Sequence, residues 1–320
     1  MTATAFSRRS LLVGLAATTM SSWAQDGPIT IVGPFGAGGT NDVVARIYAD
    51  KLGKILKRPV IVDNKPGAGG LLAAQHVARA RPDASVLLVA SNTFLIAPHI
   101  FKNAGYNPQH DFKPVTSLYT TGVAWVTRPD FFAQSIKDLV EAARKEPGKI
   151  TYSTNGIGTN THLQMEMFQA HHGIRMTHVP FKALPEGTQA VLGGLVDLAV
   201  DSPFSVASKV KSGMLRALIV FGAQREEALP EVPTNAQAGY PVPGQLEIFA
   251  GIVAPATVAD DALTAIRSAS DQVMADADFQ ARLRNARVRP LPMSHAQFDS
   301  MMKAYSEKYD ALVTRLQLRA

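Results

Sequence analysis

Short apolar, β-branched runs alternate with amphipathic helical stretches from residue 29 onward, and this alternation limits the possible folds more than any other feature. Strands are predicted at 29–33, 59–62 and 86–90, with helices at 41–56 and 68–80 between them. Continuous apolar runs of this length are typical of parallel strands that are buried on both faces. The first part of the chain is therefore predicted to form a doubly wound α/β unit.

The same alternation restarts after a long extended stretch at 115–128. Residues 94–113 are expected to be irregular. Beyond the extended stretch, helices are predicted at 135–145, 160–172, 186–192 and 205–212, and strands at 150–153, 177–179, 196–200 and 215–221. A second α/β unit of about the same size follows from this pattern.

The remaining tail contains one predicted strand, 248–254, and two long helical stretches, 259–285 and 294–317. Such a tail does not easily form a domain alone, so we expect it to pack on the first unit. This predicts one lobe from 25–120 plus 230–320 and a second lobe from 121–229. Two crossovers, near 115–128 and 215–250, would then leave a ligand cleft and a hinge between the lobes.

The first 24 residues are typical of an export signal rather than of a folded element. Arg8 and Arg9 precede a short apolar run at 11–17, and small residues lead to Ala24, so cleavage is expected before Gln25. The arginine pair is compatible with a twin-arginine signal and equally with an ordinary Sec signal. The apolar run is far shorter than the ~20 residues that span a bilayer, and no later stretch is long enough. A periplasmic protein that is not embedded in the membrane is expected.

The composition excludes several classes of function. The 320 residues include no cysteine, which rules out a lipoprotein anchor, a thiolate metal site and a cysteine nucleophile. The formal charge is +6, and loss of the two signal arginines would leave +4. Lysines and arginines are scattered and not interleaved with aromatic residues, so no nucleic-acid partner is expected. A mild positive bias suits an anionic ligand.

A glycine-rich loop at 33–42 lies between a predicted strand and a predicted helix. A plain tight turn with Thr40 or Asn41 as N-cap is the alternative, but it explains one glycine and a cap, not four glycines. Converging backbone N–H groups at a helix N-terminus form an anion site. A phosphate-binding loop would need lysine where Gly39 stands, and a dinucleotide fingerprint would need glycine where Asn41 stands. Two similar turns, 66–70 and 153–162, also follow strands. Donor-rich turns in both lobes suit a ligand with acceptors at two ends.

Four segments, 38–46, 60–70, 147–163 and 178–182, resemble the Bug (TctC-like) family of solute receptors of tripartite tricarboxylate transport systems, in the family's order. The resemblance implies a fold like that of type II periplasmic binding proteins and a dicarboxylate-type or aromatic carboxylate ligand. It implies no cofactor, no metal and no catalytic residue. The ligand-binding residues that it implies, together with Ala68 in the second turn, are Phe35, Ala37, Gly38, Gly39, Thr40, Asp42, Ser91, Asn92, Thr93, Ser153, Thr154, Thr159, His162 and Asp201.

The sequence departs from the family pattern at Phe181, Ala183 and 184–186, which puts the distal rim of the pocket in doubt. Asp42 is interpreted as a brace for its loop, although a ligand contact stays open. His162 has no recognisable nucleophile or acid partner, so it is interpreted as a hydrogen-bonding residue rather than a general base.

Three hypotheses remain from the sequence. The first is a receptor, expected to be monomeric, that delivers a small carboxylate to a membrane permease or a sensor. The second is a periplasmic hydrolase-like α/β enzyme that uses the same cleft, although no G-x-S-x-G motif is present. The third is a scaffold or signalling module with a vestigial cleft.

Overall fold

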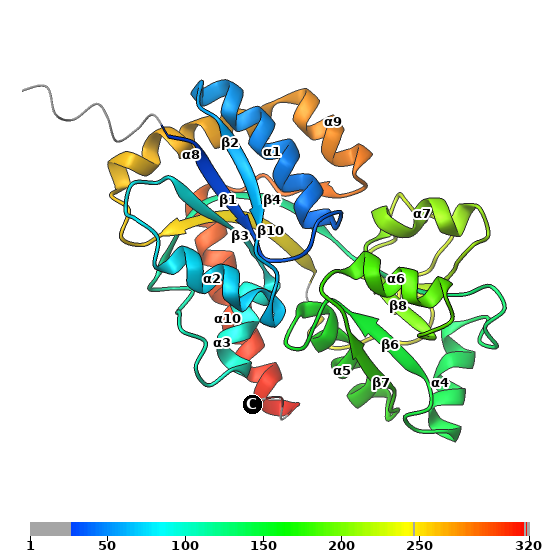
Figure 1. Ribbon diagram of the computed structural model, residues 1–320. Coiled ribbons are helices and arrows are strands. Elements are labelled where there is room, and N and C mark those ends of the chain that lie inside the picture. Colours follow the sequence, from blue (N-terminus) through cyan, green and yellow to red (C-terminus); the bar gives the residue numbers. More distant parts are fainter. Residues whose placement is uncertain (1–26, 246, 317, 319–320) are drawn as a thin grey trace, which may run out of the picture.

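The computed structural model describes residues 27–245, 247–316 and 318, so the export signal predicted at 1–24 lies outside the described residues. Two lobes stand side by side, each built on one mixed β-sheet with helices on both faces (Figure 1). The chain therefore has the two-lobed α/β architecture that the repeated alternation predicts.

The sheet of the first lobe has the strand order β11-β4-β10-β3-β1-β2. Its strands are β1 (Ile29–Gly33), β2 (Val60–Asn64), β3 (Val86–Ser91), β4 (Phe112–Thr121), β10 (Ile248–Pro255) and β11 (Arg289–Pro290). β1 pairs in parallel with β2 and β3, whereas β10 lies antiparallel between β3 and β4. The returning tail thus supplies a central strand of this sheet.

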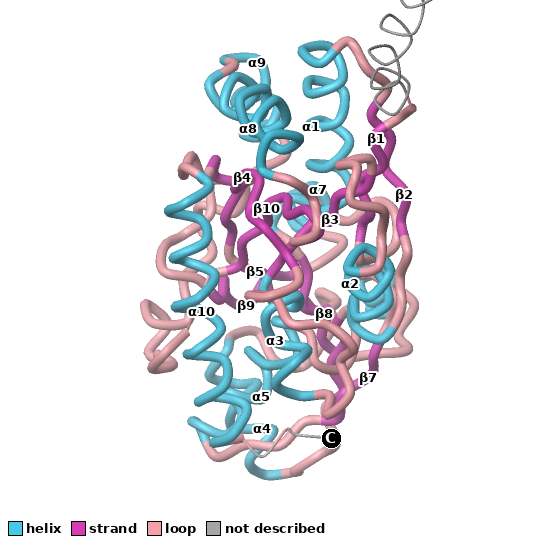
Figure 2. Tube along the Cα trace, turned by 90° about the vertical axis from the view of Figure 1, so that its left-hand side faces the viewer, coloured by secondary structure: helices cyan, strands magenta, loops and turns pink. Residues whose placement is uncertain are grey.

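Helices cover both faces of the first sheet (Figure 2). One face carries α1 (Thr40–Leu56), α8 (Asp260–Ala275) and α9 (Ala277–Asn285). The other face carries the short helix Ala68–Gly70, α2 (Leu71–Ala78), α3 (Asn92–Ile100) and the C-terminal α10 (His295–Arg315), which packs along α3. Because two apolar layers enclose it, every residue of β1 except Thr30 is buried.

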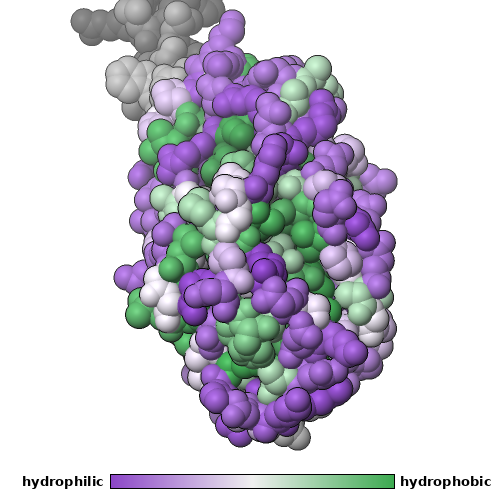
Figure 3. Space-filling model, turned by 90° about the vertical axis from the view of Figure 1, so that its right-hand side faces the viewer, coloured by the Kyte–Doolittle hydropathy of each residue, from purple (hydrophilic) through white to green (hydrophobic). Residues whose placement is uncertain are grey.

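The second lobe repeats this plan with the strand order β7-β6-β8-β5-β9. Its strands are β5 (Val123–Thr127), β6 (Thr151–Thr154), β7 (Thr177–Pro180), β8 (Leu198–Asp201) and β9 (Arg216–Phe221), and its helices are α4 (Ile136–Lys145), α5 (Asn160–His172), α6 (Leu184–Leu192) and α7 (Pro203–Lys211). Trp125 is fully buried between Phe168 and Phe221. The outer side of this lobe is largely hydrophilic, interrupted by hydrophobic patches (Figure 3).

Two segments connect the lobes. Gly122 alone separates β4 of the first sheet from β5 of the second, and residues 222–247 return the chain from β9 to β10. The Gly122 N–H donates to Glu226 Oε1 at 2.7 Å. A Cβ at position 122 would lie 3.0 Å from Val220 Cγ1 and 3.1 Å from that carboxylate oxygen. The crossover is tightly packed at this position, where only glycine fits without displacing its neighbours.

Two local predictions were wrong, and the alternative N-cap of the first helix is not the observed one. Residues 92–100 form α3, although Pro98 inside the helix made the segment look irregular. The predicted helix 259–285 is divided at Asp276, which adopts an extended backbone and caps α9 by accepting a 2.7 Å hydrogen bond from Phe279 N. The N-cap of α1 is Gly39, not Thr40 or Asn41.

Candidate functional site

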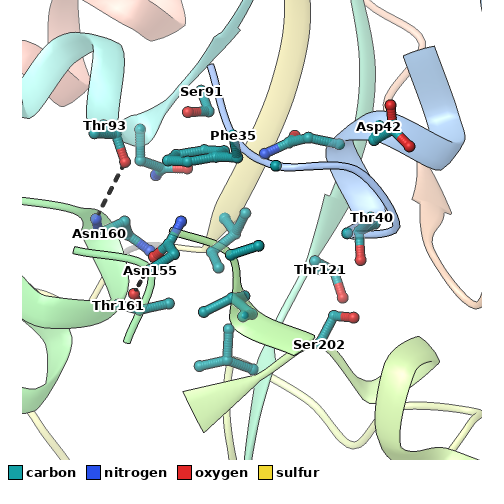
Figure 4. A pocket seen from close by; sticks show the side chains of 18 of the residues that line it. Phe35, Thr40, Asp42, Ser91, Thr93, Thr121, Asn155, Asn160, Thr161 and Ser202 are labelled. Carbon is teal, nitrogen blue, oxygen red and sulfur yellow. Dashed lines mark hydrogen bonds between the residues drawn. The ribbon is translucent and has the colours of Figure 1, made fainter. Parts of the chain in front are cut away.

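A cavity of about 60 Å³ lies between the lobes (Figure 4). A single water requires only about 10–15 Å³, so this volume accommodates a small molecule. Seven of the sequence-predicted residues line it: Phe35, Gly39, Thr40, Asp42, Ser91, Asn92 and Thr93. All seven belong to the first lobe, where Ser91 is the last residue of β3 and the others follow β1 or β3, at the carboxyl ends of parallel strands.

The first loop presents a hydroxyl to the cavity. Gly39 has an extended backbone and makes no side-chain cap, so α1 begins directly at Thr40. The Oγ1 atom of Thr40 is buried and has no hydrogen-bond partner among the described residues. The aligned peptide units of a helix place partial positive charge at its N-terminus, where this hydroxyl lies. The loop therefore offers an uncommitted donor in a favourable field for an anion.

Asp42 braces this loop through its carboxylate. Its carboxylate accepts hydrogen bonds from Gly38 N at 3.0 Å, Arg46 Nε at 3.0 Å and Asn64 Nδ2 at 2.6 Å. Burial alone would raise the pKa of Asp42, but these hydrogen bonds hold the pKa below its ordinary value. The carboxylate is turned away from the other labelled side chains (Figure 4). Its negative charge is thus neutralised by Arg46 at 2.9 Å.

The second lobe contributes the turn between β6 and α5. Asn155, Asn160 and Thr161 line the cavity from this turn, opposite Thr40 (Figure 4). Thr161 Oγ1 donates to Asn155 Oδ1 at 2.6 Å, which fixes both side chains. The backbone N–H of Asn160 donates to Thr93 Oγ1 of the first lobe at 3.4 Å. The two lobes therefore touch through groups that also line the cavity.

Three of the residues that line the cavity carry a buried polar atom with no partner among the described residues: Thr40 Oγ1, Ser91 Oγ and Asn160 Nδ2. A buried donor without a partner costs about 1–3 kcal/mol, so such groups need an explanation. Of the described residues that line the cavity, none is lysine, arginine or histidine. The arrangement can grip an anion through hydroxyl, amide and backbone donors without a cationic side chain.

The other predicted residues of the second lobe lie behind the cavity wall. Thr159 caps α5 by accepting from His162 N, and its Oγ1 donates to Gly156 O at 2.7 Å. Thr154 Oγ1 is bonded to His178 Nε2 at 2.7 Å. Ser153 is buried beside Gly187, where a Cβ would lie 2.3 Å from its Oγ. These side chains support the turn and do not line this cavity.

Asp201 also lies outside the cavity lining. It is fully buried and accepts hydrogen bonds from Thr188 Oγ1 at 2.5 Å and from Ser202 N at 2.6 Å. Burial raises the pKa of Asp201 to about 6 despite these donors. Its neighbour Ser202, which caps α7, lines the cavity instead.

His162 belongs to a buried histidine pair. Its ring stacks on His178 with centroids 4.4 Å apart, and its Nδ1 accepts from Gly158 N at 3.4 Å. Burial lowers the pKa of both rings, and for His178 burial and the neighbouring His162 together lower it to about 3. Neutral, stacked rings of this kind support the turn as hydrogen-bonding groups.

Three predicted residues of the first lobe's turns do not line this cavity. Ala37 is exposed. Gly38 uses its N–H for Asp42 and lines a groove further out. Ala68 is exposed in the second glycine-rich turn, at a positive φ of 46°. In this turn it is Gly69 that approaches the second lobe, since a Cβ there would lie 2.7 Å from Ile157 O.

Several lining residues were not predicted as site residues. Asn155, Asn160 and Thr161 belong to a turn that the sequence singles out, and the predicted helix start at 160 was the signal that could have found them. Gly36 and Asn41 lie in the glycine-rich loop 33–42, which the sequence also singles out. Tyr119, Thr121, Val123, Ser202 and Ile248 line the cavity without such a signal. Ala183 and Leu184 lie where the sequence departs from the family pattern. Glu186 in the same segment is exposed and accepts from Lys182 N at 3.1 Å.

Comparison with known proteins identifies the family. Residues 44–318 match the family described as the tripartite tricarboxylate transporter family receptor. The chain belongs to this family. A curated relative from Bordetella pertussis, described as a UPF0065 protein, is 33% identical over 264 residues, which cover 82% of this chain and 81% of the relative. The family consists of transport receptors and not of enzymes.

Solved structures of similar proteins support this assignment. The periplasmic binding protein BugD superposes with a TM-score of 0.86 at 29% identity, over 91% of this chain and 98% of BugD. MatC from Rhodopseudomonas palustris with bound malate gives a TM-score of 0.83 at 25% identity, over 89% and 98% of the two chains. The fold is that of a two-lobed periplasmic binding protein.

Neither a metal site nor a membrane-spanning helix is found among the described residues. Within 27–245 and 247–316, no cluster of three or more histidine, aspartate or glutamate side chains has the arrangement of a metal site. In the same part of the chain, no helix combines the length and the apolar character that crossing a membrane requires.

Proposed function

We propose that this protein is a periplasmic solute receptor that encloses a small carboxylate between its lobes and delivers it to a membrane permease or a sensor. It acts as a monomer after export by the Sec or twin-arginine route and removal of residues 1–24. Its lobes comprise 25–120 with 230–320, and 121–229. The bound malate of MatC, a receptor of the same fold, supports a carboxylate as the ligand.

The three unpartnered buried atoms, Thr40 Oγ1, Ser91 Oγ and Asn160 Nδ2, carry this proposal. They belong to residues that line one cavity from both lobes, so a ligand that accepts from all of them joins the lobes. A carboxylate has two oxygens with about four acceptor sites, and hydrogen bonds to a charged acceptor contribute about 1.5–3 kcal/mol each. A carboxylate therefore satisfies these donors better than a neutral molecule of the same size.

The lining also supports a small ligand rather than a nucleotide. Neutral donors are interleaved with apolar side chains such as Phe35, Val123 and Ile248, and the cavity volume is about 60 Å³. A phosphate-rich ligand would require a larger space and more positive charge than this lining supplies.

Thermal-shift measurements on the protein without residues 1–24 test the proposal. The series is acetate, succinate, malate, adipate and citrate, with glycerol as a neutral control. A saturable rise in melting temperature with at least one acid, and none with glycerol, is expected. No response to any acid, or chemical turnover of a bound acid, would refute the proposed function.

Substitution of Thr40 tests the placement of the ligand. Thr40→Val removes the hydroxyl and keeps the shape, so calorimetry with the tightest-binding acid should give a loss of about 1.5–3 kcal/mol in binding free energy. Thr40→Ser keeps the hydroxyl and is the matched control, with affinity close to that of the unsubstituted protein. Equal affinities of Thr40→Val and Thr40→Ser would contradict this placement.

A further inference from the structure

The side-chain amide of Asn92 has only one possible orientation, because two backbone groups fix it. Its Oδ1 accepts from Phe249 N at 2.8 Å, and its Nδ2 donates to Glu247 O at 2.9 Å. A backbone N–H can only donate and a carbonyl can only accept, so the amide cannot be turned over without losing both bonds. Asn92 is 1% exposed.

The orientation of Asn92 determines the direction of the next hydrogen bond. Asn92 Nδ2 also lies 2.6 Å from the hydroxyl of Tyr309 on α10. Because this nitrogen is a donor, Tyr309 Oη accepts the bond and its own hydrogen remains for another partner. That partner is Asn160 Oδ1, at 3.1 Å. Burial raises the pKa of Tyr309 far above neutral, so its proton is present.

The last residue of this chain of hydrogen bonds faces the cavity. Asn160 Oδ1 is occupied by Tyr309, so the amide must direct Nδ2 elsewhere. Nδ2 is buried, has no partner among the described residues, and belongs to a side chain that lines the cavity. Asn92 and Tyr309 belong to the first lobe, and Asn160 to the second. The relay Asn92–Tyr309–Asn160 thus crosses the lobe interface.

We propose that Tyr309, in the C-terminal helix, is a positioning residue for ligand binding. It orients the Asn160 amide so that Nδ2 donates to a ligand carboxylate, and it makes this donor available only when the lobes are closed. This inference rests on the proposed function. Tyr309 itself does not line the cavity, so its effect passes through Asn160.

A double-mutant cycle tests this coupling. Calorimetry is performed with malate, or with the acid that gives the largest thermal shift if malate gives none. Tyr309→Phe should weaken binding by about 5- to 20-fold. Asn160→Ala should weaken it at least as much, and the double variant should bind no more weakly than Asn160→Ala. Tyr305→Phe, on the same helix with its ring centroid 6.3 Å from that of Tyr309, is the matched control and should bind normally.

The outcomes separate the two proposals. If Tyr309→Phe weakens binding equally in the presence and absence of Asn160, or binds as Tyr305→Phe does, the positioning role is refuted although the proposed function stands. If Thr40→Val and Asn160→Ala both bind normally, the placement of the ligand in this cavity fails and the relay with it. If the unsubstituted protein binds none of the acids, the proposed function itself fails.

A measurement on the unsubstituted protein covers the case in which Tyr309→Phe does not fold. In nitrogen-15 NMR spectra, the side-chain amide signals of Asn160 are identified by their loss in Asn160→Ala. They should shift on addition of the acid. Unshifted signals at saturation would overturn the inference.

Discussion

Gly69 is the point at which the second glycine-rich turn meets the opposite lobe, and a single added methyl group tests whether closure at this point governs affinity. Its φ is 62°, and a Cβ would lie 2.7 Å from Ile157 O in the turn that contains Asn160. Real Cβ atoms do not approach a backbone oxygen this closely, so the lobes of Gly69→Ala must move apart.

A matched control separates the backbone strain of Gly69→Ala from the contact that its added Cβ makes with the second lobe. Alanine in a left-handed conformation costs about 1–2 kcal/mol of folding stability. Gly173, the C-cap of α5, has nearly the same φ of 61°, but a Cβ there would meet nothing within 4 Å. Gly173→Ala therefore has the backbone strain without the contact between lobes. Overpacking of an interior contact costs about 1–3 kcal/mol, and only Gly69→Ala incurs that cost on closure.

The expected result is a loss of affinity that is specific to one variant. Both variants should lose about 1–2 kcal/mol of unfolding free energy in urea titrations. Calorimetry with the tightest-binding acid should show binding about 5- to 150-fold weaker in Gly69→Ala and nearly unchanged in Gly173→Ala. Small-angle scattering at saturating acid should give a larger radius of gyration for Gly69→Ala. Equal affinities for the two variants would refute the argument that this contact limits closure.

Two further predictions concern the walls of the cavity. Lowering the pH from 7 to 5 should destabilise the protein, because the pKa of His178 is about 3 when folded and about 6.5 when unfolded, so the unfolded chain binds a proton that the folded ring refuses. The loss of unfolding free energy begins as the pH falls through 6.5 and should reach about 1 kcal/mol at pH 5 after allowance for solvent screening. In urea titrations, the unfolding free energy of His178→Gln should depend less on pH than that of the unsubstituted protein. Equal pH dependence of the two proteins would contradict the assignment to His178. Asp42→Asn should lower the unfolding free energy by about 1–3 kcal/mol, because the carboxylate that braces the first loop loses its charge-assisted hydrogen bonds. Asp63→Asn is the control, since it changes an exposed carboxylate on β2 and should alter the unfolding free energy little. Similar losses of unfolding free energy in both variants would refute the bracing role of Asp42.

The architecture was largely predictable because hydrophobic periodicity is local. β1 and α5 were predicted with their observed bounds, and β10, α8 and α9 of the tail pack on the first lobe because their apolar residues need a partner. Segment 94–113 was not predicted correctly, because α3 is buried on nearly all sides and lacks a polar face, and its Pro98 is normally a helix breaker.

The site was predictable only in part, for a different physical reason. A turn rich in glycine and threonine marks where a ligand can bind, but not which of its side chains enter the cavity. Thr159 and Asn160 are adjacent, yet the first caps a helix and the second lines the cavity. Tyr309 lies 149 positions from Asn160 along the chain, and no local pattern connects them.

The position of β10 has a consequence for the order in which the chain folds. The second lobe is one continuous segment, so its sheet can be completed as soon as β9 is available. The first sheet is interrupted between β3 and β4 until residues 248–255 arrive from beyond the whole second lobe. Until then, two exposed strand edges face a gap that only β10 fills. Strands β1 to β4 must therefore wait for β10, which lies in the last quarter of the chain. Cutting the chain after residue 245 should leave a folded second lobe attached to an unfinished first one.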